Sequence, residues 1–455
     1  MQTDMPEPSA DSPSQPALMA MPTAEQPAAR TRAAGAPRVR QAERAQVEWR
    51  PVALDALLPD DHRARAVWQY VEGLDLTPLY ASIQATEDQA GRPATDPKIL
   101  LALWLYATID GVGSARALAR QCEAHLAYQW LCGGVPMNHT TLAAFRTAHV
   151  AFLDTLLTRS VATLMAEGLV TLQRVALDGM RVRASAGAAS FRRRPTLERC
   201  LAEAEAQVQA LRAELEADSA GASQRERAAR ERAARDRAAR VAQALTQLAE
   251  LEAKKKPPIA SAEKAQARVS TTDPDARVMK MADGGFRPAY NIQFATDTGA
   301  QVIVGVDVSN RGSDRGQLAP MVEQLTQRHQ QPPGAMLVDG GFVTVQDIET
   351  VSPRTTVYAP VPQPRDPARD PWAPLPGDSP AVAAWRQRMG TPEAQTLYKE
   401  RAATAECVNA QTRNRGLLRL LVRGLAKVRA IALWHALAHN LSRSFALWAP
   451  AAAAA

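Results

Sequence analysis

The chain has 455 residues, 46% of them apolar, which is enough to fill the cores of two or three ordinary domains. No apolar run reaches the roughly 18 residues that a membrane span needs, and the amino terminus has acids where a secretory signal has basic residues. The four cysteines form no CxxC pair and no metal-ligand spacing, which argues against a disulfide scaffold, a zinc finger and thioredoxin-like chemistry. We therefore expect a cytoplasmic protein that makes no contact with a membrane.

The positive charge of the chain is concentrated near its carboxyl end. The net charge is +7, and residues 407–455 contain no Asp or Glu. The basic side chains of that segment are Arg413, Arg415, Arg419, Arg423, Lys427, Arg429 and Arg443. Because a planar guanidinium group suits phosphate oxygens, a basic segment this concentrated predicts a polyanionic partner, with nucleic acid as the first choice.

Helices are predicted for the first third of the chain, after a leader. Residues 1–45 are rich in Pro, Ala and Gln and predict disorder. Asp96 and Pro97 then form the start signal of a helix that continues to Ile109.

Two further helices follow a glycine-containing turn. Ser114 caps a helix that carries Arg116 and Arg120, and another helix is expected from about residue 138 to a stop at Gly168. A helix, a turn and a basic helix are compatible with a DNA-binding helix-turn-helix, with Arg116 and Arg120 toward the DNA. An ordinary helical bundle explains the same pattern.

Strand patterns begin after Gly168 and predict an interrupted sheet. Expected strands cover residues 170–182, 289–295, 301–308, 335–338 and 355–358, and expected helices cover 317–329, 344–350 and the chain from about 391. Between the first two strands, residues 195–256 are charged and rich in Ala with partial heptads, which predicts an inserted helical hairpin whose Arg-rich middle is a solvated face. The predicted fold class is mixed α/β, preceded by an all-α amino-terminal domain.

Acidic residues stand directly after two of the predicted strands. Asp178 and Asp339 each precede glycine, and carboxylates at adjacent strand ends of an open α/β sheet can share divalent cations. A plain Asp-Gly turn is the alternative explanation, and Asp283 and Asp307 are rival candidates. Glu406, the last acid of the chain, could supply a third carboxylate.

Several sequence blocks resemble bacterial insertion-sequence transposases of the DDE type, over roughly residues 50–445. The blocks are MNHTTLAAFR, LDGMRVRASAG, STTDPDARVMKMADGGFRPAYNIQFATD, LVDGGFVTVQDIE and YKERAATAECVNAQTR. The resemblance implies an RNase H-like catalytic sheet interrupted by the helical hairpin, and it makes Asp178, Asp339 and Glu406 the catalytic, metal-binding triad.

The last block also implies supporting residues that contact DNA or hold the triad. These are Tyr398, Arg401 and Arg413. The sequence departs from the family in two places, because Arg413 stands where many relatives have Lys and residues 407–409 replace a commoner Pro-Val-Phe stretch. Such changes beside the triad could lower activity.

The resemblance further implies a mechanism, a cofactor and partners. Two Mg²⁺ or Mn²⁺ ions about 3.5–4 Å apart would activate the nucleophile and neutralise the leaving oxygen. Asp178 would bridge both ions, with Asp339 on one and Glu406 on the other. Water would free a 3′-hydroxyl at the transposon end, and that hydroxyl would then attack target DNA. The implied partner is double-stranded DNA, bound by a homo-oligomer associated with the nucleoid.

These inferences divide the chain into parts. The expected parts are a leader at 1–45, a helical DNA-binding domain at 46–168, a catalytic domain at 169–194 and 257–445, the hairpin at 195–256 and a flexible tail at 446–455. Within the basic segment, Arg419, Arg423 and Lys427 are four residues apart, so we expect them to share one helical face that holds phosphates. A solvated amphipathic helix is the alternative. His435 and His439 have the same spacing, but no acid lies nearby to support a metal site.

Three functions are compatible with this sequence. The first is an active DDE transposase. The second is a catalytically inactive DNA-binding protein, either a decayed or a domesticated transposase, and the third is an RNase H-like nuclease without strand transfer.

Overall fold

A computed structural model describes residues 51, 53–85, 93–217, 221–254, 267–364, 366 and 368–454. The leader predicted at 1–45 lies outside these residues. Within the described part, none of the helices combines the length and the apolar character that crossing a membrane would require.

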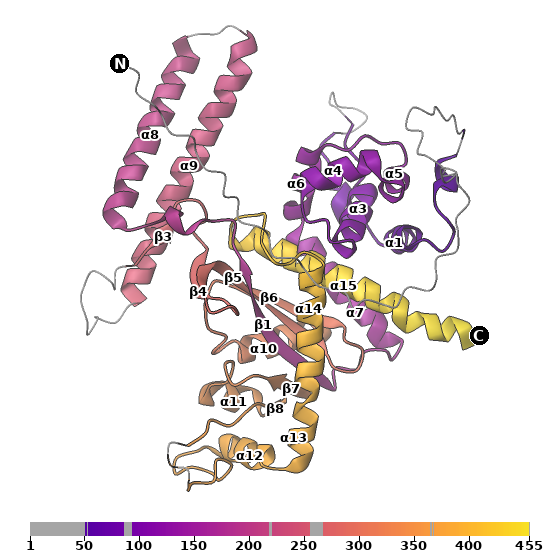
Figure 1. Ribbon diagram of the computed structural model, residues 1–455, viewed down its shortest axis with the longest axis vertical. Helices are drawn as coiled ribbons and strands as arrows, with labels where there is room; N and C mark the ends of the chain where they lie inside the picture. The colour runs from indigo at the N-terminus through magenta and orange to yellow at the C-terminus, as the bar shows by residue number, and fades with distance from the viewer. Residues whose placement is uncertain are drawn as a thin grey trace, which may run out of the picture. The chain divides into compact units, whose positions relative to one another are not determined.

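The amino-terminal region is helical and is built around one buried helix, α3 (Pro97–Ile109) (Figure 1). Because α3 is apolar on all sides, it can be surrounded by other helices, and nearly all of its residues are buried. Its neighbours are α1 (Arg63–Glu72), α5 (Leu126–Cys132), α6 (His139–Ala148) and α15 (Leu425–Ala454). The short elements η1 (Leu54–Leu57) and α2 (Thr77–Tyr80), together with α4 (Ala115–Ala124) and α7 (Val150–Ala166), complete the region.

Capping residues place the helix starts where the sequence predicts them. The Asp96 carboxylate accepts from the amide of Lys98 at 2.8 Å, and α3 ends at Ile109 as predicted. The Ser114 hydroxyl similarly caps α4. The single helix predicted from 138 to 168 is wrong, because His149 has ψ of 46° and separates α6 from α7.

The sheet is mixed, which confirms the α/β class with a helical amino-terminal region. Its strands are β1 (Arg174–Arg183), β4 (Arg277–Lys280), β5 (Phe286–Asp297), β6 (Ile303–Ser309), β7 (Ala335–Val338) and β8 (Thr356–Tyr358). The order is β4-β5-β1-β7-β8, and β6 also pairs with β5. The pairs among β1, β4, β5 and β6 are antiparallel, whereas β1, β7 and β8 run parallel.

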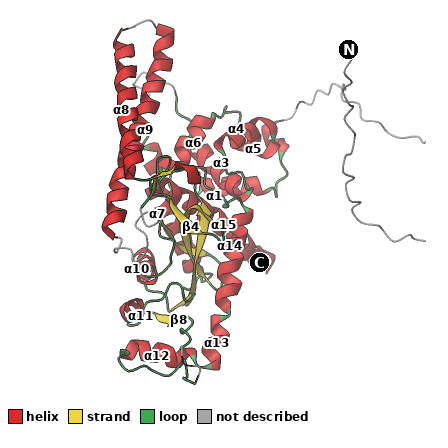
Figure 2. Ribbon diagram, turned by 60° about the vertical axis from the view of Figure 1, so that its left-hand side comes forward, coloured by secondary structure: helices red, strands yellow, loops and turns green. Residues whose placement is uncertain are grey.

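Helices cover both faces of the sheet. In two views, α10 (Leu318–His329) and α11 (Val345–Val351) lie on one side and α13 (Pro392–Tyr398) and α14 (Cys407–Asn414) on the other (Figures 1 and 2). A π-helix, Ala402–Glu406, joins α13 to α14. The helix α12 (Pro380–Met389) precedes α13 and is missing from the sequence prediction, in which the last helices begin only at about residue 391, although Pro380 is a helix-start signal.

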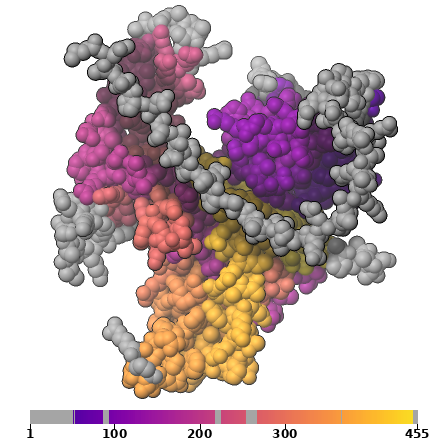
Figure 3. Space-filling view, in the orientation of Figure 1, coloured from indigo at the N-terminus to yellow at the C-terminus, as the bar shows by residue number. Residues whose placement is uncertain are grey.

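Two long helices, α8 (Arg194–Ala217) and α9 (Gly221–Lys254), connect β1 to the rest of the sheet and stand out from it (Figure 3). Their contact is apolar at the base, where Leu197, Val241 and Leu248 are buried. They begin and end beside a two-stranded sheet of β2 (Phe191–Arg192) and β3 (Val269–Ser270).

The Arg-rich middle of α9 is not wholly a solvated face, as the sequence led us to expect. Glu231 is buried against α8 and forms ion pairs with Arg212 and Arg235. This cluster joins the two helices where the apolar positions are lacking.

The single basic helix predicted near the carboxyl end is wrong. Helix α14 ends at Asn414, and α15 starts only at Leu425. The intervening residues are irregular because Gly416 and Gly424 have φ of 92° and 88°, which a helix cannot accommodate. At its other end α15 reaches Ala454, through a segment that we predicted as a flexible tail but whose alanines have high helix propensity.

Candidate active site

The two strand-end acids lie on neighbouring strands. Strands β1 and β7 are parallel, and Leu177 is in register with Val338, so Asp178 and Asp339 follow a paired position. Strand β7 ends there, whereas β1 continues to Arg183. The Asp-Gly of β1 is therefore not a turn but part of a continuous strand.

Asp178 is partly buried and has one strong amide partner. Its Oδ2 accepts a hydrogen bond from Asn409 Nδ2 at 2.8 Å. Burial raises the pKa of the Asp178 carboxyl, and the negative charges of Asp339 and Asp314 raise it further, while the positive charge of Arg401 opposes them. Asp178 thus lies in a site where negative charge is crowded.

Arg401 joins the second and third acids of the predicted triad. Its side chain is 12% exposed, and its two terminal nitrogens lie 3.8 Å from Asp339 Oδ2 and 4.0 Å from Glu406 Oε1. One turn before it, the Tyr398 hydroxyl donates to the carbonyl of Val338 at 3.1 Å and so holds the end of β7. Burial raises the pKa of Tyr398, which keeps this donor protonated.

Glu406 is positioned by the π-helix. Ala405, the residue before it, packs on Ala176, Ala335 and Leu337 of the sheet, while the Glu406 side chain remains 69% exposed. The wider turn of a π-helix is common at functional sites because it changes the direction of the side chains that follow. No feature of the AATAE sequence predicts it.

Asn409 is the site residue that the sequence analysis missed. It lies in the stretch at 407–409 that departs from the family pattern, and it is buried. Its bond to Asp178 spans 231 residues of sequence, so only the folded chain reveals it. Arg413 is exposed one turn further along α14, on the same face as Asn409.

Replacing Asn409 by Ala should lower DNA cleavage by roughly 10–100-fold, the usual effect of removing a group that orients a ligating side chain. Asn409→Asp is the matched comparison, because it keeps the size but adds a negative charge next to Asp178, and it should be at least as damaging. Cleavage of a labelled substrate measures both. Full activity of Asn409→Ala would show that Asp178 is held by other groups.

The alternative candidates for the triad, Asp283 and Asp307, form ion pairs with other residues. Asp283 pairs with Arg287 at 2.6 Å, and Asp307 pairs with Arg429 at 3.3 Å. Neither pair involves a residue of the proposed triad.

The donor atoms fit a hard divalent cation, although the three acids do not form a closed cage. Among the described residues, no three His, Cys, Asp or Glu side chains stand close enough together to hold a metal ion. Asp178 and Asp339 nevertheless bring two negative charges close together where β7 ends. Carboxylate oxygens are the ligands that Mg²⁺ and Mn²⁺ prefer. Glu406 is exposed and would have to turn toward them.

The basic residues predicted to contact DNA lie in different settings. Arg116 and Arg120 are exposed and share one face of α4, opposite the buried Leu118. Arg419 forms an isolated parallel bridge with Arg183, whereas Arg423 and Lys427 line a cleft of about 640 Å³ beside α9. The structure therefore does not bring Arg419, Arg423 and Lys427 together on one helical face.

The turn before α4 is held by a buried cation. The Arg146 guanidinium donates to the carbonyl of Gly113 and lies 4.6 Å from the centre of the Trp104 ring. Burial lowers the pKa of Arg146 to about 10, so the group is still protonated at neutral pH. In the described part of the chain, no carboxylate pairs with it.

His435 and His439 are core residues of α15. His439 bonds the carbonyl of Gln301, and both rings are buried. Burial, with a smaller contribution from nearby arginines, lowers the pKa of His435 to about 3 and that of His439 to about 4.

This burial makes the fold sensitive to mild acid. In the unfolded chain the two imidazoles bind protons below pH 6.5 or so, whereas the folded chain keeps them neutral. The free energy of unfolding should therefore fall as the pH drops from about 6.5 toward 4, by about 1.4 kcal/mol per pH unit for each ring. Denaturant unfolding at pH 7 and pH 5 measures the slope. His435→Phe should reduce it, and an unchanged slope would contradict this account.

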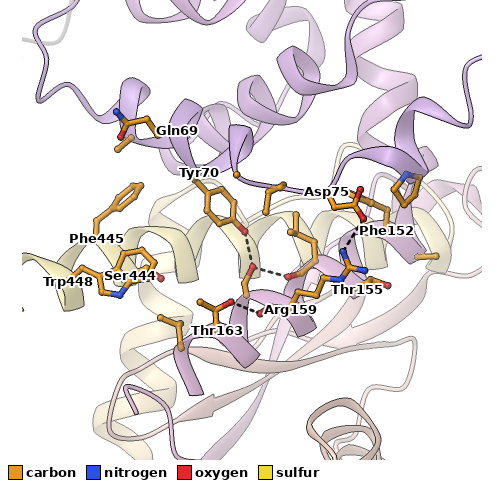
Figure 4. Close-up of a pocket in the computed structure, with 18 residues that line it drawn as sticks. Gln69, Tyr70, Asp75, Phe152, Thr155, Arg159, Thr163, Ser444, Phe445 and Trp448 are labelled. Atoms are coloured by element: carbon orange, nitrogen blue, oxygen red, sulfur yellow. Dashed lines mark hydrogen bonds and ion pairs between the residues drawn. The ribbon is translucent and has the colours of Figure 1, made fainter. Parts of the chain in front are cut away.

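A separate apolar cavity of about 990 Å³ lies between α1, α7 and α15 (Figure 4). Tyr70, Phe152, Phe445 and Trp448 line it, and its polar contacts include the bond between Tyr70 and Ser160 at 2.8 Å and the ion pair between Arg159 and Asp75 at 3.6 Å. None of the three acids reaches it, so this cavity is not the site of phosphodiester chemistry.

Two segments of the chain match known families. Residues 52–148, which contain α1 to α6, match the family described as "Transposase domain (DUF772)". Residues 378–445, which contain α12 to α14, Arg401 and Glu406, match the family described as "Transposase DDE domain". No curated protein and no solved structure matches the chain.

Both matches define a transposase, and they confirm the resemblance that the sequence blocks suggested. Together they support an insertion-sequence transposase of the DDE type. A transposase family implies DNA binding, and the DDE domain suggests a metal-dependent DNA-cleaving enzyme. Asp178 and Asp339 lie outside both matched segments, so their roles depend on the geometry described above.

Proposed function

We propose that this transposase cleaves phosphodiester bonds at the ends of its element and joins the freed 3′-hydroxyl to target DNA, with Asp178, Asp339 and Glu406 as the catalytic triad. The observation that carries the proposal is the placement of Asp178 and Asp339 on adjacent parallel strands, with Arg401 between Asp339 and Glu406.

The three carboxylates would hold two Mg²⁺ or Mn²⁺ ions. When bound, such ions supply a more acidic attacking water or hydroxyl and neutralise charge on the leaving oxygen. Asn409 orients the carboxylate of Asp178, and Tyr398 fixes the end of β7 beneath Asp339. Arg401 keeps Glu406 near the other acids and partly balances their charge.

The sheet supports the proposal that the catalytic domain is RNase H-like. Three antiparallel strands, β6-β5-β1, continue into the parallel pair β7-β8, and the α8–α9 hairpin enters after β1. On this basis we propose a helical DNA-binding domain at 46–168, a catalytic domain at 169–194 and 257–445, and the hairpin at 195–256 as an insertion.

We assign sequence reading to α4 and general phosphate contacts to the other basic residues. The latter are Arg413, Arg419, Arg423 and Lys427, together with Tyr398 and Arg401 near the cut strand. A homo-oligomer on DNA would allow both transposon ends to be handled together.

Removing Arg116 and Arg120 tests this assignment. The double Ala variant should lose most of its preference for the end sequence over a scrambled duplex, because each base-reading contact is worth about 1–3 kcal/mol of discrimination. Competition binding at one fixed salt concentration measures the preference. Equal weakening on both duplexes would instead mean that these arginines contact phosphates.

A labelled end fragment incubated with Mg²⁺ separates the three candidate functions. The transposase should nick the 3′ end and join it to a target plasmid. A nuclease would cut without joining, and an inactive DNA-binding protein would do neither.

A further inference from the structure

The segment 310–317 connects β6 to α10 and is bonded to residues on both sides of the proposed site. At one end, Arg181 of β1 donates to the carbonyl of Gly312 at 3.0 Å. At the other end, the amide of Gly316 donates to the carbonyl of Phe342 at 3.2 Å. The segment is therefore tied both to the strand of Asp178 and to the residues that follow Asp339.

Asp314 is the centre of these contacts. Its Oδ1 accepts from Asn291 Nδ2 at 2.5 Å and from Gln293 Nε2 at 3.2 Å, both on β5. Its Oδ2 lies 3.8 Å from Arg181, and the side chain is only 12% exposed. The charge of Asp314 is thus satisfied inside the protein and is not presented to solvent.

The close approach of Asp314 explains why residue 179, which follows Asp178 within a continuous strand, is glycine. A Cβ at this position would lie 2.2 Å from Asp314 Oδ1 and 2.9 Å from Asn291 Oδ1, so no other residue fits without displacing Asp314. The loop therefore packs directly on the backbone next to the first acid of the proposed triad.

Two arginines on this loop face solvent. Arg311 and Arg315 are exposed on either side of Asp314. Throughout the described residues, no carboxylate forms an ion pair with either one. Arg315 adjoins Gly316, which is bound to Phe342, three residues after Asp339.

We propose that residues 310–316 form a phosphate-binding loop at the edge of the active site, with Asp314 as the positioning residue that fixes it to the sheet. This deepens the proposed function, on which it rests. Arg311 and Arg315 would hold backbone phosphates of the DNA strand that flanks the scissile bond, for which a rigid guanidinium fork is well suited.

Binding of a labelled end duplex across a salt series tests the loop. The double variant Arg311→Ala, Arg315→Ala should flatten the log–log salt slope by about 0.9 for each lost phosphate contact. Arg199→Ala is the matched control, because Arg199 is an exposed arginine on α8, 72% accessible, and its removal should leave the slope unchanged. An unchanged slope in the double variant would overturn the proposal.

Asp314→Asn separates positioning from simple electrostatics. Removal of a negative charge should by itself strengthen DNA binding, whereas loosening of the loop should weaken it several-fold, and we expect the weaker binding. Gly179→Ala should weaken binding in the same way without changing any charge. Binding by both variants that equals or exceeds that of the parent would contradict the role of Asp314.

These outcomes are independent of the triad assignment, because binding is measured without cleavage. If the loop variants bind weakly but Asp178→Asn still cleaves, the proposed triad is wrong and the loop stands. If either single variant fails to fold, as its thermal transition would show, the Arg311 and Arg315 double variant still decides the question.

Discussion

Neutralising any one acid of the triad should abolish cleavage while DNA binding stays within a few-fold of the parent. Asp178→Asn, Asp339→Asn and Glu406→Gln keep the size of each side chain but remove the charge that a divalent cation requires. We expect a loss of at least roughly 10³-fold in cleavage, as is typical when one member of a catalytic unit is removed. Binding should persist because DNA affinity depends mainly on basic groups.

The measurement is cleavage of a labelled end fragment with Mg²⁺, beside a binding curve for the same fragment. Asp283→Asn is a suitable control, because Asp283 pairs with Arg287 away from the triad. The Asp283→Asn variant should therefore cleave DNA normally. Near-normal cleavage by one of the three triad variants would remove that residue from the active site.

Truncating Arg146 should produce the largest loss of stability. Its side chain fills the space beside Trp104, and its backbone carbonyl also accepts from Trp434 Nε1 at 2.9 Å. Arg146→Ala would leave a cavity and an unpaired Gly113 carbonyl, so we expect the free energy of unfolding to fall by about 3 kcal/mol.

Arg146→Met distinguishes packing from hydrogen bonding. It keeps most of the volume and removes a buried charge that has no acidic partner, so the loss of stability should be clearly smaller. Both variants should weaken binding to the end sequence, because the turn before α4 loses its support. Denaturant unfolding measures the stability of both variants, and a binding curve for the end sequence measures their DNA affinity. An unchanged free energy of unfolding in Arg146→Ala would contradict the structural role of this side chain.

Local signals in the sequence predicted the elements that local chemistry determines. The Asp96 cap and Pro97 define the start of α3, and four consecutive apolar residues define β7. The helix expected at 344–350 is likewise present, and Thr344 and Asp347 cap each other at its start.

Features that depend on distant contacts or on backbone conformation were not predictable. The breaks at Gly416 and Gly424 arise from positive φ values, which an even spacing of arginines conceals. Asn409 became a site residue only because α14 packs against β1. Two acids at strand ends could be proposed from their sequence context, but their adjacency required the pairing of β1 with β7.

The packing of α15 has a consequence for how the chain folds during synthesis. Helix α15 contacts α3, α6 and α7, and the bond from Trp434 to Arg146 spans 288 residues. The amino-terminal helices therefore leave the ribosome long before the surface that covers them exists. At about 5–20 residues per second, the apolar sides of these helices stay uncovered for tens of seconds. The amino-terminal helical region should thus reach its final form only after residue 434 has been made, and chaperone binding to the nascent chain should be strongest during that interval.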